Sequence, residues 1–212
     1  MKKIISEIFR KTIHFSGLFL IILYTFILNE FSKTWANLTL VAVLLILLEV
    51  ERIRIEHKPK IVAIFKELFR KREEENISGA VFFVISCIIC FAVFDYWIAI
   101  LALLMTVVGD LVSALMGRIF GKTKIYKDKS IVGTVSGLFA NISVSMFVLS
   151  GFPILTLIMA SIASFTEMIT IKLDDNLTVP LFAGFFGQIY LYYSGIILPP
   201  DNFIFSYIFS IS

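Results

Sequence analysis

One segment of the sequence, residues 109–137, concentrates the residue types that act on phosphate groups. Within it, Asp110, Ala114, Gly117 and Gly121 recur at helical spacing, so they share one face of a helix. Small residues let helices pack closely, but such packing does not require a carboxylate in the same face. Mg²⁺ prefers one or two carboxylates, completed by phosphate oxygens and water. Asp110 is therefore a candidate metal ligand.

The residues that follow this helix form a candidate anion site. Ser130 is a typical N-cap residue, and the next apolar stretch begins directly behind it. A helix N-terminus offers free N–H groups and the positive end of the helix dipole, so with a flanking cation it favours phosphate. A glycine in the first turn allows close backbone approach. The candidate phosphate ligands are Arg118, Lys122, Lys129, Ser130, Gly133 and Thr134.

Further carboxylates fall near the inner ends of predicted membrane-spanning stretches. They are Glu49, Asp110 and Glu167, and ionisable residues inside spans are functional candidates because they are costly to bury. Since all three lie at a similar depth beside the basic loops, we expect them to share one site at the inner face. A second acidic group, Asp174-Asp175-Asn176, follows Glu167. Three interpretations of this group are open. It forms a turn in which Asn176 caps the last helix, or its carboxylates complete a metal site with Asp110, or they supply a general base for a hydroxyl.

The elements that position these residues are apolar. Hydrophobic residues make up 58% of the 212 residues and charged residues 17%, whereas soluble domains are usually about 45–50% apolar. A helix needs about 20 mostly apolar residues to cross a bilayer. We predict an all-α, polytopic membrane helix bundle, one integral membrane domain over residues 1–212. Its seven spans are expected at about 13–29, 34–50, 77–94, 96–117, 131–150, 153–170 and 177–198.

The distribution of positive charge predicts the orientation. With the N-terminus inside, Lys33 is the only one of the 19 Lys and Arg residues on the outer side, as the positive-inside rule requires. Trp35, Tyr96 and Trp97 then fall at outer span ends, where interfacial aromatic residues are expected. The net charge of +3 therefore says little about nucleic acid, because the positive charge lies on the face that meets the anionic lipids of the inner leaflet. Residues 58–72 predict a helix on the inner leaflet or against the base of the bundle.

Basic residues and a histidine stand at the inner start of the first span. Arg10 and His14 are four residues apart and share a helix face, with Lys11 beside them. His14 is either a functional residue of the inner-face site or an interfacial histidine with a local partner. Arg10 and Lys11 either bind phosphate or satisfy the positive-inside rule.

In this order, the residues resemble the CTP-dependent polyprenol kinase family, which includes dolichol kinase, phytol kinase and CTP-dependent diacylglycerol kinase. The family's RKxxH-like stretch is similar to residues 10–14 and its GDxxAxxxGRxxGK-like segment to residues 109–122. Its KSxEGS-like turn resembles residues 129–134, and its DNxxxP-like stretch resembles residues 175–180. Two further matches are the early Glu with Arg, at Glu49 or Glu51 with Arg52, and the late Glu, at Glu167. The chain departs from the family at Val132, where the family usually has Glu.

The resemblance implies transfer of the γ-phosphate of CTP to the hydroxyl of a membrane alcohol at the cytoplasmic face. The implied acceptors are a polyprenol, a shorter prenol such as phytol or geranylgeraniol, and diacylglycerol. Asp110 and Asp175 would hold Mg²⁺, and Asn176 would join the nucleotide-binding residues. The hydroxyl proton would pass to His14, Asp174 or Asp175, with Glu167 in the same catalytic group. A homo-oligomer is compatible with this interpretation.

Two other classes of function compete with a kinase. A CDP-lipid synthase would use a similar nucleotide site but transfer the nucleotidyl part. A small membrane transporter would need a polar path, yet the outer halves of the predicted spans hold no ionisable residue. A transfer assay with labelled CTP separates these alternatives.

Overall fold

The structure, a computed structural model, describes residues 17–57, 77–126, 129–170 and 173–201. Within these residues the chain forms seven helices and one small hairpin, so the predicted all-α class and the order of its seven helices are confirmed. The elements are α2 (Gly17–Glu30), α3 (Lys33–His57), α5 (Gly79–Val93), α6 (Tyr96–Phe120), β1 (Lys124–Tyr126), β2 (Lys129–Ser130), α7 (Ile131–Val148), α8 (Pro153–Ile169) and α9 (Asp175–Ser194).

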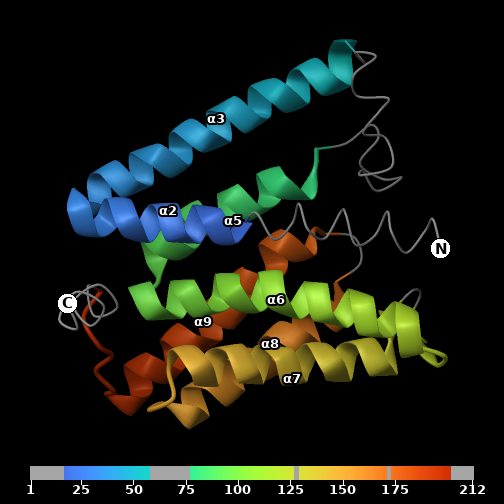
Figure 1. The fold of residues 1–212 in the computed structure, drawn as a ribbon. Helices are drawn as coiled ribbons and strands as arrows, with labels where there is room; N and C mark the ends of the chain where they lie inside the picture. Colours follow the sequence, from blue (N-terminus) through green and yellow to red (C-terminus); the bar gives the residue numbers. More distant parts are fainter. Residues whose placement is uncertain (1–16, 58–76, 127–128, 171–172, 202–212) are drawn as a thin grey trace, which may run out of the picture.

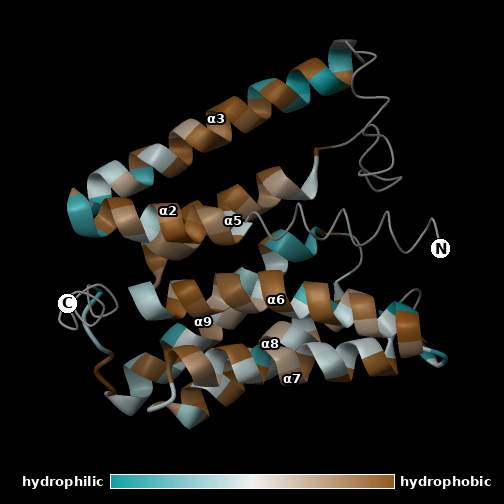
Figure 2. Ribbon diagram, viewed as in Figure 1, coloured by the Kyte–Doolittle hydropathy of each residue, from teal (hydrophilic) through white to brown (hydrophobic). Residues whose placement is uncertain are grey.

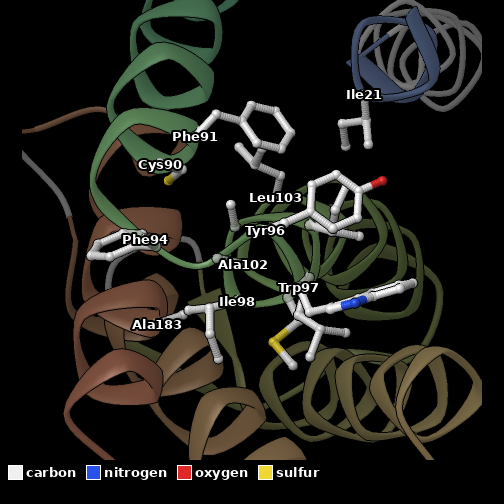
Figure 3. Packing of buried hydrophobic residues seen from close by; sticks show 14 of the residues in the cluster. Ile21, Cys90, Phe91, Phe94, Tyr96, Trp97, Ile98, Ala102, Leu103 and Ala183 are labelled. Carbon is white, nitrogen blue, oxygen red and sulfur yellow. The ribbon is translucent and has the colours of Figure 1, made fainter. Parts of the chain in front are cut away.

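Helix α6 is the centre of the bundle. Helices α7, α8 and α9 pack on one side of it and α2 and α5 on the other, while α3 lies outermost on α2 and α5 (Figure 1). Almost every residue in the first half of α6 is buried, because it is apolar all round and surrounded by other helices. Figure 3 shows this core: Ile98 of α6 lies beside Ala183 of α9, while Phe91 of α5 and Tyr96 of α6 pack on each other on the side of Ile21 of α2.

Successive helices run in opposite directions, which agrees with the predicted topology. The C-terminal ends of α3 and α6 and the N-terminal ends of α5 and α7 all lie at the same end of the bundle (Figure 1). We call this end the hairpin end, since β1 and β2 pair there as antiparallel strands. The predicted loop 118–130 thus contains a strand pair that the sequence analysis did not anticipate.

Two helices, α6 and α7, are long and apolar enough to cross a membrane, and α2, α5 and α8 are apolar but shorter. Large apolar side chains also cover outward faces: Phe19 on α2 is 64% exposed and Phe147 on α7 is 90% exposed. Contiguous apolar surface of this kind marks an interaction with membrane or protein. Figure 2 shows apolar residues along all seven helices, with polar ones at the ends of α3 and near the hairpin. Together these features indicate a membrane protein, and spanning by the other helices stays a prediction.

The three aromatic residues expected at outer span ends all lie near the start of a helix, α3 or α6, but they differ in exposure. Trp35 is exposed, but Tyr96 and Trp97 are buried. Tyr96 and Trp97 can be buried because their polar atoms form hydrogen bonds within the protein. The Tyr96 hydroxyl donates to Thr25 Oγ1 at 2.9 Å, and Trp97 Nε1 donates to the Pro199 carbonyl at 2.8 Å. The predicted interfacial helix 58–72 lies outside the described residues.

Candidate functional site

A buried polar cluster lies between α6 and α8 near the hairpin end. Asp110 and Ser113 come from α6, one turn apart, and Glu167 comes from α8; all three are less than a tenth exposed. The Ser113 hydroxyl donates a hydrogen bond to Glu167 Oε1. The structure thus brings Glu167 to the α6 face that holds Asp110, although the two carboxylates are 57 positions apart in the sequence.

Lys129 supplies the positive charge of this cluster. Its Nζ lies 3.6 Å from Glu167 Oε1, and its side chain is 30% exposed. The hairpin determines where Lys129 lies, because Tyr126 pairs with Lys129 and Lys124 pairs with Ser130 across the two strands. A lysine half-open to solvent beside a buried carboxylate can exchange that partner for an incoming phosphate oxygen.

The start of α7 has the cap that the sequence predicts. The Gly133 amide donates to Ser130 Oγ at 3.1 Å, so Ser130 is the N-cap. Gly133 also lies against the backbone of α6: a Cβ there would be 2.7 Å from the Ser113 carbonyl oxygen and 3.2 Å from Gly117 Cα. This close approach brings the positive end of the α7 dipole next to the Asp110 turn of α6.

The N-terminus of α9 adds the acidic group to the same region. Asp174, not Asn176, is the N-cap: its Oδ1 accepts from the Asn176 amide at 3.1 Å. Asn176 instead donates its side-chain Nδ2 to the Gly79 carbonyl at 3.1 Å and so ties α9 to the start of α5. Asp175, also buried, begins the helix.

Electrostatic interactions link α6, α8, α9 and strand β2. The charges of Asp110 and Asp175 both act on the Glu167 carboxylate, and Lys129 opposes them. Asp110, Glu167 and Asp175 are three buried carboxylates in this region, and carboxylate oxygens are the ligands that Mg²⁺ prefers. Asn176 Oδ1 is buried without a hydrogen-bond partner and adds an oxygen donor. Over the described residues, no group of three or more His, Cys, Asp and Glu residues lies close enough together to hold a metal ion.

Glu49, the third carboxylate predicted to lie within a span, is found elsewhere. Glu49 is exposed on α3 and pairs with Arg52, whose Nε donates to Glu49 Oε2 at 3.0 Å. The buried acidic residue of α3 is Glu51, which accepts from Arg54 Nε at 2.8 Å. The expectation that Glu49 shares one site with Asp110 and Glu167 was therefore wrong, because two positions along a helix change the face that a residue occupies.

The remaining predicted residues divide into two groups. Arg118 is exposed in the last turn of α6, Lys122 is exposed just beyond it, and Thr134 is half-buried in the first turn of α7. All three therefore lie at the hairpin end. Arg10, Lys11 and His14 lie outside the described residues. Sequence reasoning missed Ser113 and Arg54; in each case the signal was a polar partner three residues from a carboxylate on the same helix face.

Comparison with known proteins gives partial matches. The chain is 32% identical over 119 residues to an uncharacterized protein of Methanocaldococcus jannaschii, covering 54% of this chain and 60% of that protein. It is 32% identical over 132 residues to CTP-dependent diacylglycerol kinase 1 of Schizosaccharomyces pombe, covering 54% and 61%. The chain thus spans about three-fifths of the length of these relatives. No protein-family model and no solved structure matches the chain.

Proposed function

We propose that this protein is a CTP-dependent lipid kinase, which transfers the γ-phosphate of CTP to the hydroxyl of a membrane alcohol at the hairpin end. The observation that carries the proposal is the contact of Lys129 and Ser113 with Glu167, beside Asp110 and the capped start of α7. The distant similarity to a CTP-dependent diacylglycerol kinase supports the same class of reaction. Phosphoryl transfer depends mainly on positioning and charge neutralisation, which such a cluster supplies.

The nucleotide would bind where cations and helix N–H groups meet. Lys129 and the first turn of α7 would hold the phosphates, with Arg118 and Lys122 around them, and Asn176 would contribute from α9. Asp110 and Asp175 would hold Mg²⁺, which neutralises phosphate charge when bound. The candidate N-terminal ligands Arg10 and Lys11 belong to the same proposal.

The acceptor would approach from the lipid, with its hydroxyl at headgroup level and its tail along the exposed apolar helix faces. The hydroxyl oxygen attacks the γ-phosphorus, the bond to the β-phosphate oxygen breaks, and CDP leaves with that electron pair. The hydroxyl proton passes to His14, Asp174 or Asp175, with Glu167 nearby as a further carboxylate. The proposed acceptors are polyprenols, shorter prenols such as phytol or geranylgeraniol, and diacylglycerol.

The test uses purified protein in detergent with Mg²⁺, CTP labelled at the γ-phosphate, and these acceptors offered singly. Label in the lipid phase identifies a kinase and its acceptor. Labelled pyrophosphate without labelled lipid identifies a cytidylyltransferase and refutes the proposal. If neither product appears, the variant Val132→Glu tests whether restoring the acidic residue at the start of α7 brings transfer back.

Asp110→Asn is the decisive variant, since it removes one charge without changing side-chain shape. We expect it to abolish lipid labelling while expression is retained. Asp95→Asn is the matched control: Asp95 is the N-cap at the opposite end of the same helix, where it contacts Gln188. Full activity in Asp110→Asn would refute the metal assignment.

A further inference from the structure

A second polar contact, which involves α6, α7 and α8, lies one turn away from Glu167. Asn141 of α7 is 1% exposed, and its Nδ2 donates to Ser164 Oγ of α8 at 3.1 Å. Gly109 of α6 faces Asn141 so closely that a Cβ at Gly109 would overlap Asn141 Oδ1. The contact is therefore built from one residue of each of α6, α7 and α8.

This contact is in helical register with the Glu167 cluster. Gly109 precedes Ser113 by four residues on α6, and Asn141 follows Gly137 by four residues on α7; a Cβ at Gly137 would lie 3.0 Å from Ser113 Cβ. Ser164 precedes Glu167 by three residues on α8. Residues three or four apart share a helix face, so the rotation of α8 that brings Ser164 to Asn141 also turns Glu167 toward Ser113.

Stability does not explain an asparagine at this position. Asn141 Oδ1 is buried and has no hydrogen-bond partner, which costs free energy, whereas an apolar side chain of the same shape avoids that cost. Nearby Ser145 on α7 is equally buried, but its hydroxyl bonds only to the Ile142 carbonyl of its own helix. Of these two polar residues of α7, Asn141 is the one that reaches α8.

We propose that Asn141 is a positioning residue, which fixes the rotation of α8 so that Glu167 holds Lys129 ready for the nucleotide. The proposal rests on the proposed kinase function for its consequence in catalysis. The effect of Asn141 on the Lys129–Glu167 contact does not depend on that function, and it can be measured without a catalytic assay.

The experiment measures how fast an amine-acylating reagent modifies Lys129, with exposed Lys122 as the reference in the same digest by mass spectrometry. Glu167→Gln removes the carboxylate charge directly and defines the fully released rate. Asn141→Leu should raise the Lys129 to Lys122 ratio toward that rate without lowering the unfolding temperature. Ser164→Ala breaks the same bond from the other helix and serves if Asn141→Leu does not fold. Ser145→Ala is the matched control and should leave the ratio unchanged.

The kinetic consequence is measured on the same variants. We expect Asn141→Leu to raise the KM for CTP about tenfold, the scale of a lost charge-assisted contact, with less effect on kcat. A wild-type ratio in both Asn141→Leu and Ser164→Ala, with a raised ratio in Glu167→Gln, would overturn the positioning role. Absence of transfer in the wild-type protein would instead refute the kinase proposal, while the acylation ratios still decide the positioning role.

Discussion

Replacing Gly133 by alanine tests whether the site depends on the close approach of α6 and α7. The added Cβ would lie 2.7 Å from the Ser113 carbonyl oxygen, and both of its nearest backbone neighbours, this oxygen and Gly117 Cα, belong to α6. Backbone atoms of a packed helix cannot rotate away as a flexible side chain can. Since ordinary contact starts at 3.4 Å, the two helices must separate locally by about 0.7 Å.

This separation has two expected effects. Overpacking of a core contact costs about 1–3 kcal/mol, and the better helix propensity of alanine recovers up to about 1 kcal/mol. The net loss therefore lies between about 0 and 3 kcal/mol, and its midpoint of about 1.5 kcal/mol corresponds to a fall of roughly 3–6 °C in unfolding temperature for a chain of this size. The start of α7 also moves relative to Asp110, and because misplacement by about 1 Å can cost roughly 100-fold in rate, we expect phosphoryl transfer to fall about 10- to 100-fold.

The assay combines thermal unfolding in detergent with the transfer reaction on γ-labelled CTP. Gly151→Ala is the matched control, because a Cβ at Gly151 would meet no atom within 4 Å and its φ is not positive. It should change the unfolding temperature by no more than about 1–2 °C. If Gly133→Ala behaves like Gly151→Ala in both measurements, the close helix contact is not what organises the site, and the reasoning is refuted.

Three further variants test separate contacts. Lys129→Gln should raise the KM for CTP about 10- to 100-fold, since it removes a charged hydrogen-bond donor, and Lys33→Gln at the opposite end should not. Ser130→Ala removes the α7 cap and should lower stability by about 1 kcal/mol, or roughly 2–4 °C by thermal unfolding, with Ser130→Asp restoring it. Arg54→Met leaves a buried carboxylate unpaired and should cost about 3–5 kcal/mol, whereas Arg52→Met at the exposed pair should leave the unfolding temperature nearly unchanged; equal effects would contradict the assigned burial.

Local signals predicted much of the structure. The seven apolar stretches became seven helices because each is continuous and bounded by turn residues, as at Gly151 and Pro153 before α8. Ser130 caps α7 because its hydroxyl needs only the amide three residues later. The short β1–β2 hairpin was not predicted, because strands of three and two residues leave no periodic pattern to recognise.

Contacts between distant residues were beyond such signals. The sequence singled out Asp110 and Glu167 as costly carboxylates, but not the Ser113 hydroxyl that bonds Glu167 across 54 positions. It placed Glu49 inside a predicted span and left Glu49 and Glu51 as alternative matches to the family, whereas Glu51 is the buried one of the two. A hydropathy pattern shows how apolar a stretch is, but the face that turns inward depends on the helices packed against it.

Sequence alone therefore determined the helices, their order, the Ser130 cap of α7 and the concentration of charge at one end, since these depend on residues close together in the chain. Tertiary structure decided which polar groups meet: Lys129 with Glu167, Asn141 with Ser164, and Asn176 with the Gly79 carbonyl. The physical reason is that each of these contacts depends on the rotation and separation of two packed helices or of a helix and the hairpin. Those quantities are set by side-chain volume across the interface, as at Gly109 and Gly133, and not by either segment alone.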